Sequence, residues 1–224
     1  MNVAIIVAAG SGTRFGAGRP KQFLIIAGKP LLIHTLEKFE NCRAIDRLIL
    51  VLSEGEIANF QTLAQKFNLT KLAKIVAGGK TRAESVFNGL RAIEEETAVQ
   101  IVAVHDGARP FVDCAEISAT VEKAKDTGAA CLTALVTDTI KEVADGVITG
   151  TIERAKLRRA LTPQAFRFEI LRKAFAGADL SEAATDECFL VERTGQTIAV
   201  VEGSAKNIKI TTPEDWQFAE ILLR

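Results

Sequence analysis

The N-terminal part of the chain places basic side chains beside closely spaced glycines. Gly10 and Gly12 follow an apolar run, and Arg14 and Lys21 come soon after them. No acidic residue occurs before Glu37, although the whole chain holds 28 acidic and 28 basic residues. Backbone amides of a glycine-rich loop can bind phosphate oxygens, and nearby cations favour negative charge. These residues therefore predict a binding site for a phosphate chain.

Two familiar phosphate-binding motifs are nearly matched but fail at single positions. The dinucleotide fingerprint G-x-G-x-x-G would need a glycine at position 15, where the chain has Phe15. A P-loop ending at Gly79–Thr81 would need its opening glycine at position 74, which is Lys74. A Rossmann oxidoreductase and a P-loop enzyme are therefore disfavoured. A purely structural turn stays open for the N-terminal loop, but it does not explain why acidic residues are absent there.

A second group of polar residues follows the apolar run Ile101–Val104. Asp106 could hold Mg²⁺ or a sugar hydroxyl, and Arg109 could balance it or face a phosphate. Ligands of open parallel sheets gather at the carboxyl ends of strands, where these two residues are expected. An Asp–Arg pair that only fixes the turn is the alternative. His105 beside them is expected to be packed and hydrogen-bonded rather than catalytic.

The third candidate group is the glycine-rich segment Gly78–Ser85. Its two glycines allow the backbone to approach a flat ligand, and Ser85 is expected one turn into the following helix. Four further features, each taken alone, indicate a structural rather than a functional role. They are Arg154, the loop Leu161–Gln164, the helix start Thr185–Glu187, and the short strand Ile208–Ile210 that carries Lys209.

The elements that must position these residues alternate along the chain. Continuous hydrophobicity, rather than alternation, indicates strands that are covered on both faces. Such runs predict strands at Val3–Val7, Leu48–Leu52, Ile101–Val104, Cys131–Val136, Ile198–Val201 and Ile208–Ile210. Amphipathic stretches at 57–67 and 83–93 predict helices between them. This order predicts an α/β fold with a doubly wound, mostly parallel sheet, in one domain over residues 1–224.

Helix N-termini are predicted from capping residues. Thr81 with Glu84 forms a capping-box pattern, and Thr212–Asp215 is a strong start for the last helix.

One segment departs from the strand–helix order. Asp145 and Gly146 form a hairpin turn signal between two stretches, 139–143 and 147–152, that alternate apolar and polar residues. An isolated two-stranded hairpin is only marginally stable in water. This β-arm, at about residues 137–153, should therefore lie against its own domain or a second subunit. We favour a second subunit, and an ordinary surface hairpin is the alternative.

Composition narrows the class of protein. The formal net charge is zero, which argues against a general binder of nucleic acid or of anionic membranes. The four cysteines are scattered without a C-x-x-C pair, which is typical of reduced thiols and not of a zinc site. The N-terminal apolar run is too short for a membrane span and lacks the features of a signal peptide. A cytoplasmic protein is therefore expected.

Taken together and in this order, these pieces resemble the 2-C-methyl-D-erythritol 4-phosphate cytidylyltransferases of the non-mevalonate isoprenoid pathway. The resemblance runs from Val7 to the terminal helix. It rests on A-A-G-x-G-x-R at Ala8–Arg14, P-K-Q at Pro20–Gln22, G-G-x-x-R-x-x-S at Gly78–Ser85, H-D-x-A-R-P at His105–Pro110, Asp138–Thr139, Arg154, L-T-P-Q at Leu161–Gln164, T-D-E at Thr185–Glu187 and N-I-K at Asn207–Lys209. Each motif alone is weak, but the whole series in register is specific.

The resemblance implies a Rossmann-like nucleotidyltransferase that moves a cytidylyl group from CTP to a sugar-alcohol phosphate and releases pyrophosphate. Arg14 and Lys21 would stabilise the transition state at the α-phosphate, and Arg154 and Lys209 would orient the acceptor phosphate; these four are the implied catalytic residues. The residues implied for CTP are Ala8, Ala9, Gly10, Gly12, Gly79, Ser85 and Asp106. The residues implied around the acceptor are Asp106, Arg109, Thr139, Arg154, Thr162, Thr185 and Lys209.

The resemblance further implies a divalent cation and a dimer. Mg²⁺ or another divalent cation would be held mainly by the triphosphate, with Asp106 as a candidate ligand. In the implied homodimer, the hairpin arm reaches the site of the neighbouring subunit, and no nucleic-acid or membrane partner is expected. Two alternatives stay open: a cytidylyltransferase that uses ribitol 5-phosphate, and a non-catalytic nucleotide-binding module. Retention of Arg14, Lys21 and Lys209 with Asp106 speaks against the second.

Overall fold

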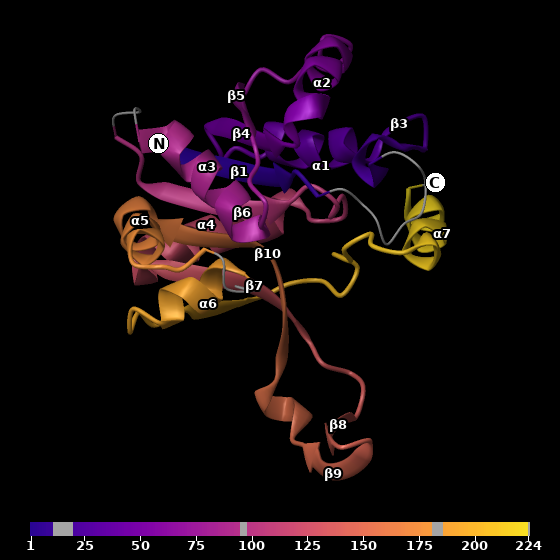
Figure 1. The fold of residues 1–224 in the computed structure, drawn as a ribbon, viewed down its shortest axis with the longest axis vertical. Coiled ribbons are helices and arrows are strands. Elements are labelled where there is room, and N and C mark those ends of the chain that lie inside the picture. Colours follow the sequence, from indigo (N-terminus) through magenta and orange to yellow (C-terminus); the bar gives the residue numbers. More distant parts are fainter. Residues whose placement is uncertain (11–19, 95–97, 181–185, 224) are drawn as a thin grey trace.

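A seven-stranded sheet forms the centre of the computed structural model, which describes residues 1–10, 20–94, 98–180 and 186–223 (Figure 1). In spatial order its strands are β11 (Ala199–Glu202), β7 (Ala129–Leu135), β10 (Arg158–Arg167), β6 (Ile101–Asp106), β1 (Asn2–Ala8), β4 (Arg47–Leu52) and β5 (Leu72–Ala77). β10 runs antiparallel to both of its neighbours, and all other neighbouring strands in this sheet are parallel. The predicted α/β fold with a mostly parallel sheet is confirmed.

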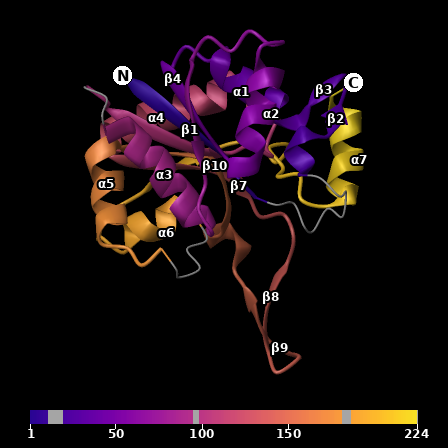
Figure 2. The same cartoon turned by 45° about the horizontal axis from the view of Figure 1, so that its top comes forward.

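Helices cover both faces of this sheet, as Figures 1 and 2 show. One face carries α1 (Leu31–Glu40), α2 (Ile57–Ala64) and α4 (Cys114–Thr127), and the other carries α3 (Arg82–Glu94), α5 (Phe168–Ala176) and α6 (Glu187–Glu192). Within β1, Ala4 and Ile6 join the first apolar layer, whereas Val3 and Ile5 join the second. Successive side chains of a strand point to opposite faces, so one continuous apolar run supplies both layers.

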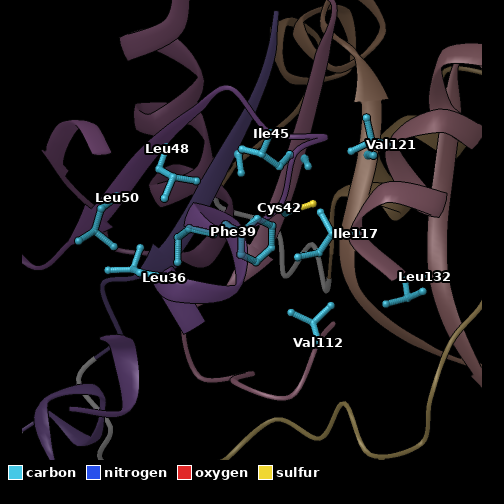
Figure 3. Close-up of a cluster of buried hydrophobic side chains, with 14 of the residues drawn as sticks. Leu36, Phe39, Cys42, Ile45, Leu48, Leu50, Val112, Ile117, Val121 and Leu132 are labelled. Carbon is cyan, nitrogen blue, oxygen red and sulfur yellow. The ribbon is translucent and has the colours of Figure 1, made fainter. Parts of the chain in front are cut away.

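The larger apolar layer extends to the carboxyl end of β6. In Figure 3, Phe39 of α1 lies at the centre of this layer, with Leu36, Val112 and Ile117 around it. Phe39 is fully buried, and its ring centroid lies 4.7 Å from that of His105 at the end of β6. The core therefore supports the residues that follow β6 directly.

The prediction of a loop at Leu161–Gln164 is wrong, because these residues lie inside β10. A proline within a segment argues against a strand, since it cannot donate to the ladder. The structure accommodates Pro163 where the pairing of β10 with β7 shifts its register, between Ala160 and Gln164. β10 is thus a strand with an irregularity at its proline.

The prediction of a strand at Ile208–Ile210 is also wrong, because this stretch has no regular secondary structure. The backbone N–H of Ile208 donates locally to the oxygen of Lys206 (2.7 Å), and that of Ile210 donates to the oxygen of Ala108 (2.9 Å). The stretch therefore crosses the end of β6 as an irregular segment instead of adding a strand to the sheet.

Two of the three predicted helix starts are capped by their threonines, and the third, at α6, is capped by Asp186. The hydroxyl of Thr81 accepts from the backbone N–H of Glu84 (3.0 Å), while the Glu84 carboxylate accepts from Lys80 N (2.6 Å). α7 (Pro213–Leu222) begins with a complete capping box between Thr212 and Asp215. It packs beside the small ribbon of β2 (Ile25–Ile26) and β3 (Lys29–Pro30) (Figure 2).

A hairpin of β8 (Ile140–Ala144) and β9 (Val147–Ile152) extends away from the sheet, as both ribbon views show (Figures 1 and 2). Apolar side chains near its turn are uncovered: Val143 is 62% exposed and Val147 is 64% exposed. The short 3₁₀ turn η4 (Arg154–Lys156) leads from β9 into β10. The role of this hairpin at a subunit interface stays a prediction.

Two predictions from composition can be compared with the described part of the chain. Each helix in that part is too short or too polar to cross a lipid bilayer. The four cysteines are free thiols, and Cys42, Cys131 and Cys188 are buried.

Replacing Phe39 by alanine should lower the free energy of unfolding by about 3–5 kcal/mol, because the change leaves a cavity between α1 and His105. Chemical denaturation measures this loss. Phe218→Ala is the matched control: Phe218 is 61% exposed on α7, and its loss should stay below about 0.5 kcal/mol. Equal losses at both positions would contradict the central place of Phe39 in the core.

Candidate active site

A pocket of about 450 Å³ opens at the carboxyl ends of the parallel strands. Ala8 ends β1, Asp106 ends β6, and Gly79 follows β5; all three line the pocket. The sheet grows from β1 in two directions, with β4 on one side and β6 on the other. Ligands of open α/β sheets bind at such switch points. The pocket therefore lies where this fold places a ligand.

Most of the residues predicted for nucleotide binding share this pocket. Its lining includes eight predicted residues: Ala8, Ala9, Gly10, Lys21, Gly79, Ser85, Asp106 and Lys209. Lys21 belongs to the 3₁₀ turn η2 (Lys21–Phe23), and Lys209 lies in the segment 203–211 before α7. Three other predicted residues, Gly12, Arg14 and Thr185, lie outside the described residues. The individual roles of these residues stay predictions.

The carboxylate of Asp106 is the centre of a charge cluster at the pocket floor. Its Oδ1 accepts from Arg82 Nε (3.1 Å), and its Oδ2 contacts Arg109 Nε (3.2 Å) and Lys209 Nζ (3.0 Å). The backbone N–H of Asp106 donates to the hydroxyl of Thr162 (3.2 Å). Three cations from three separate segments therefore meet one buried anion.

Asp106 stays ionised in this environment. Burial alone would raise the pKa of its carboxyl, but Arg82, Lys209 and Arg109 outweigh burial and hold that pKa well below its ordinary value. The predicted Asp106–Arg109 pair is therefore real, and two further cations that the sequence did not connect with it complete the cluster.

Arg82 connects this cluster to α6. Its Nη1 and Nη2 contact the two carboxylate oxygens of Glu187, at 2.5 and 3.1 Å, while its Nε holds Asp106. The Glu187 side chain is only 2% exposed. Burial disfavours the charge of Arg82, but the two carboxylates outweigh it and raise the pKa of the guanidinium. Arg82 is therefore a permanent cation that bridges two buried acids.

His105 is a packed residue, as expected. Its Nε2 lies 3.1 Å from the backbone oxygen of Arg109, and its Nδ1 lies 2.9 Å from the hydroxyl of Thr162. A carbonyl oxygen can only accept, so Nε2 carries the proton and the hydroxyl of Thr162 donates to Nδ1. Burial is the main cause that lowers the pKa of His105 to about 3. The ring is neutral at physiological pH and orders Thr162 rather than transferring protons.

The glycine-rich segment after β5 packs directly against the end of β1. A Cβ on Gly78 would lie 2.3 Å from that of Ala9, so no larger residue fits there without displacing β1. The N–H of Gly79 donates to the hydroxyl of Ser85 (3.1 Å), which donates in turn to the oxygen of Thr81 (2.9 Å). This close approach brings two of the predicted nucleotide-binding segments together.

The segment that carries Lys209 is clamped at Asn207. The side-chain amide of Asn207 donates to the backbone oxygen of Thr162 (2.8 Å), and the backbone oxygen of Asn207 accepts from Arg109 Nη1 (2.8 Å). Asn207 is fully buried. These bonds hold an irregular segment firmly enough to aim Lys209 at Asp106.

The side chains of the site limit how a divalent cation could be held there. In the described part of the chain, no three His, Cys, Asp or Glu side chains gather into a metal-binding group. Asp106 is the acidic residue among those that line the pocket, and its oxygens already contact three cations. This set fits Mg²⁺ that arrives on phosphate oxygens with at most one protein carboxylate, and it does not fit Mg²⁺ held by protein ligands alone.

Four described residues that were predicted for the acceptor do not line the pocket. Arg109 and Thr162 contact Asp106, whereas the other two lie at the hairpin. Among the described residues, the pocket lining does not include Thr139 or Arg154. Thr139 immediately precedes β8, and Arg154 donates to the backbone oxygen of Thr137 at the base of the hairpin. A separate hollow there is lined by Arg154 and Arg158. Within one chain, these residues belong to the hairpin.

Sequence reasoning missed several residues that build the site: Gln22, Arg82, Gln164, Glu187 and the anchoring role of Asn207. All lie within motifs quoted above. Gln164 donates to Asp186 (2.8 Å) and accepts from Cys188 N (3.0 Å), which fixes the start of α6. A buried acid at a helix start, such as Glu187, looks in sequence like an acid that favours the helix dipole. Only the fold shows its partner.

Comparison with known proteins shows which family this chain belongs to. The family model of 2-C-methyl-D-erythritol 4-phosphate cytidylyltransferase matches residues 2–224. The chain belongs to this family. The 2-C-methyl-D-erythritol 4-phosphate cytidylyltransferase of Bacillus licheniformis is 46% identical over 225 residues, covering 100% of this chain and 96% of that relative.

Solved structures of the cytidylyltransferase family agree with this fold. The 4-diphosphocytidyl-2C-methyl-D-erythritol synthase from Anaerococcus prevotii matches with a TM-score of 0.86 at 29% identity, covering 100% of this chain and 96% of that one. The enzyme from Francisella tularensis matches with a TM-score of 0.81 at 34% identity, covering 98% of each chain. The family predicted from the motifs is therefore confirmed.

Replacing Arg82 by methionine should lower the free energy of unfolding by about 3–5 kcal/mol near pH 7, because Glu187 would stay buried without its partner. Burial raises the pKa of Glu187 above its ordinary value of 4.5. A carboxyl with a raised folded-state pKa costs stability only above its unfolded pKa, so the loss should shrink as the pH falls towards 4.5. Denaturation at several pH values measures both effects.

The double variant Arg82→Met with Glu187→Leu is the control, because it removes both charges. It should recover most of the lost stability. A double variant as unstable as Arg82→Met, at every pH, would show that the pair does not carry the effect.

Proposed function

We propose that this chain transfers the cytidylyl group of CTP to 2-C-methyl-D-erythritol 4-phosphate, with release of pyrophosphate. Membership of the cytidylyltransferase family supports the reaction. One observation of the site carries the proposal further: Lys21 and Lys209 line the same pocket from two segments, beside Gly10 and Asp106. This arrangement suits a reaction between two phosphate-bearing substrates.

The main obstacle to this reaction is repulsion between anions. The acceptor is a phosphate monoester whose second pKa is about 6, so it is mostly a dianion at neutral pH. It must approach a triphosphate. Placing fixed cations where charge builds up lowers the barrier without reorganisation during the reaction. We assign Lys21, together with Arg14, to the α-phosphate, and Lys209 to the phosphate of the acceptor.

The reaction needs no general base, because the dianionic acceptor is already deprotonated. The state of the histidine nearest the pocket agrees with a reaction without a general base. His105 is buried and neutral, with both ring nitrogens bonded to the protein. Catalysis by positioning and charge is the usual pattern of phosphoryl-group transfer.

A divalent cation completes the proposed charge balance. Bound Mg²⁺ would neutralise part of the triphosphate charge, and Asp106 is the protein carboxylate within reach of the pocket. The chain's own contribution is to keep Asp106 ionised and fixed through Arg82.

A pyrophosphate-release assay with CTP tests the reaction. Activity is expected with 2-C-methyl-D-erythritol 4-phosphate and a turnover at least about tenfold lower with ribitol 5-phosphate, a discrimination that bonds to substrate hydroxyls readily supply. Faster turnover with ribitol 5-phosphate would select the alternative acceptor. Binding of CTP without release of pyrophosphate in the presence of either acceptor would indicate a nucleotide-binding module.

We further propose that the active protein is a homodimer in which the hairpin of one subunit completes the pocket of the other. Thr139 and Arg154 lie at the hairpin, outside the pocket of their own chain. The uncovered apolar side chains of Val143 and Val147 are suited to contact with another protein surface. A second copy of the chain would supply that surface.

Mixing two variants of strongly reduced activity tests this arrangement. In a mixed dimer of Arg154→Ala and Lys21→Ala subunits, one pocket would combine an intact Lys21 with an intact Arg154 from the other chain. Random reassociation of equal amounts should then restore about one quarter of the wild-type activity. If both residues served the pocket of their own chain, the mixture would be no more active than the separate variants.

A further inference from the structure

The side chain of Gln22 ties η2 to the end of β1. Its amide Nε2 donates to the backbone oxygens of Ala8 (2.7 Å) and Gly10 (3.1 Å). Gln22 is only 4% exposed, although it lines the pocket. A primary amide has two N–H donors, and both are used here. One side chain therefore joins two segments that are separated in the sequence by residues 11–19.

Residues on both sides of Lys21 are anchored by the same turn. The N–H of Phe23 donates to the oxygen of Pro20 (3.1 Å), and the N–H of Leu24 donates to the oxygen of Lys21 (3.0 Å). The ring of Phe23 packs near that of Phe60, with centroids 6.4 Å apart. The turn thus has an apolar anchor at Phe23 and a polar anchor at Gln22, next to Lys21.

The polar anchor also matters for charge. Carbonyl oxygens carry partial negative charge, and Ala8 and Gly10 both line a pocket that is proposed to receive phosphates. A donor that engages both oxygens reduces the repulsion that they would exert on an anion. A carboxylate or an apolar side chain at this position could not donate to them.

We infer that Gln22 is a positioning residue that fixes Lys21 relative to the end of β1, an inference that rests on the proposed function. It does not touch the reacting atoms through its amide group, which is committed to Ala8 and Gly10. It acts through Lys21. Small displacements of a catalytic cation are costly, since a misplacement of about 1 Å can reduce turnover about 100-fold.

A double-mutant cycle separates this role from a structural one. Gln22→Met keeps the length of the side chain but removes both donors. In the wild-type background it should lower kcat about 10- to 100-fold, with a smaller change in KM for CTP. In the Lys21→Ala background it should lower kcat less than about threefold, because the residue through which it acts is gone. Equal losses in both backgrounds would overturn the inference.

Asn2→Leu is the matched control. Asn2 is likewise a buried amide, and it donates to the backbone oxygen of Ala44 (2.8 Å) at the opposite end of β1. Both variants should lower the thermal unfolding midpoint, but only Gln22→Met should lower kcat. A comparable fall in kcat for Asn2→Leu would show that lost stability explains the effect.

A binding measurement keeps the inference independent of turnover. Calorimetric titration with inorganic pyrophosphate should show weaker binding for Gln22→Met, about tenfold, in the wild-type background and no further weakening in Lys21→Ala. If the wild-type chain releases no pyrophosphate from CTP with either acceptor, the proposed function fails, and this binding cycle still decides the role of Gln22. Equal weakening in both backgrounds would refute that role.

Discussion

The ionised carboxylate of Asp106 is the constraint on which the rest of the site depends. Arg82 of α3, Arg109 after β6 and Lys209 before α7 all converge on it. Three cations would repel one another without an anion between them, and the buried anion would be unfavourable without the cations. Each segment is therefore held in place by the others through a shared charge. The irregular segment before α7 relies on this most, because it has no strand ladder of its own.

The three cations of this cluster differ in how far they are exposed at the pocket. Among the three cations, the side chain of Lys209 is the most exposed, at 35%, compared with 24% for Arg82 and 12% for Arg109. Arg82 is committed to two acids, whereas Lys209 contacts Asp106 from the open side. In the proposed reaction, Lys209 would be the cation of this cluster that a phosphate meets first. Fixed charges of this kind need little rearrangement when a ligand binds.

Sequence reasoning recovers what depends on local pattern. Five of the seven strands of the sheet, the capped helices and most of the pocket residues follow from apolar runs, capping threonines and motif order. It fails where distant parts of the chain decide the outcome. Pro163 argues against a strand, but two neighbouring strands enclose its segment in β10. Ile208–Ile210 is apolar like a strand, but it has no partner strand. Glu187 and Gln22 gain their roles from contacts with Arg82 and the end of β1, which no local pattern records.

The hairpin of β8 and β9 lies in the connection between β7 and β10, which are antiparallel neighbours in the sheet. A segment inserted in the connection between two paired strands leaves the strand order and the register of the sheet unchanged, whatever the length of that segment. The hairpin can therefore gain, lose or exchange residues over evolutionary time while the pocket at β1 and β6 keeps its shape. The paired strands therefore hold the pocket in place, while the connection that carries the hairpin can change without moving any of them.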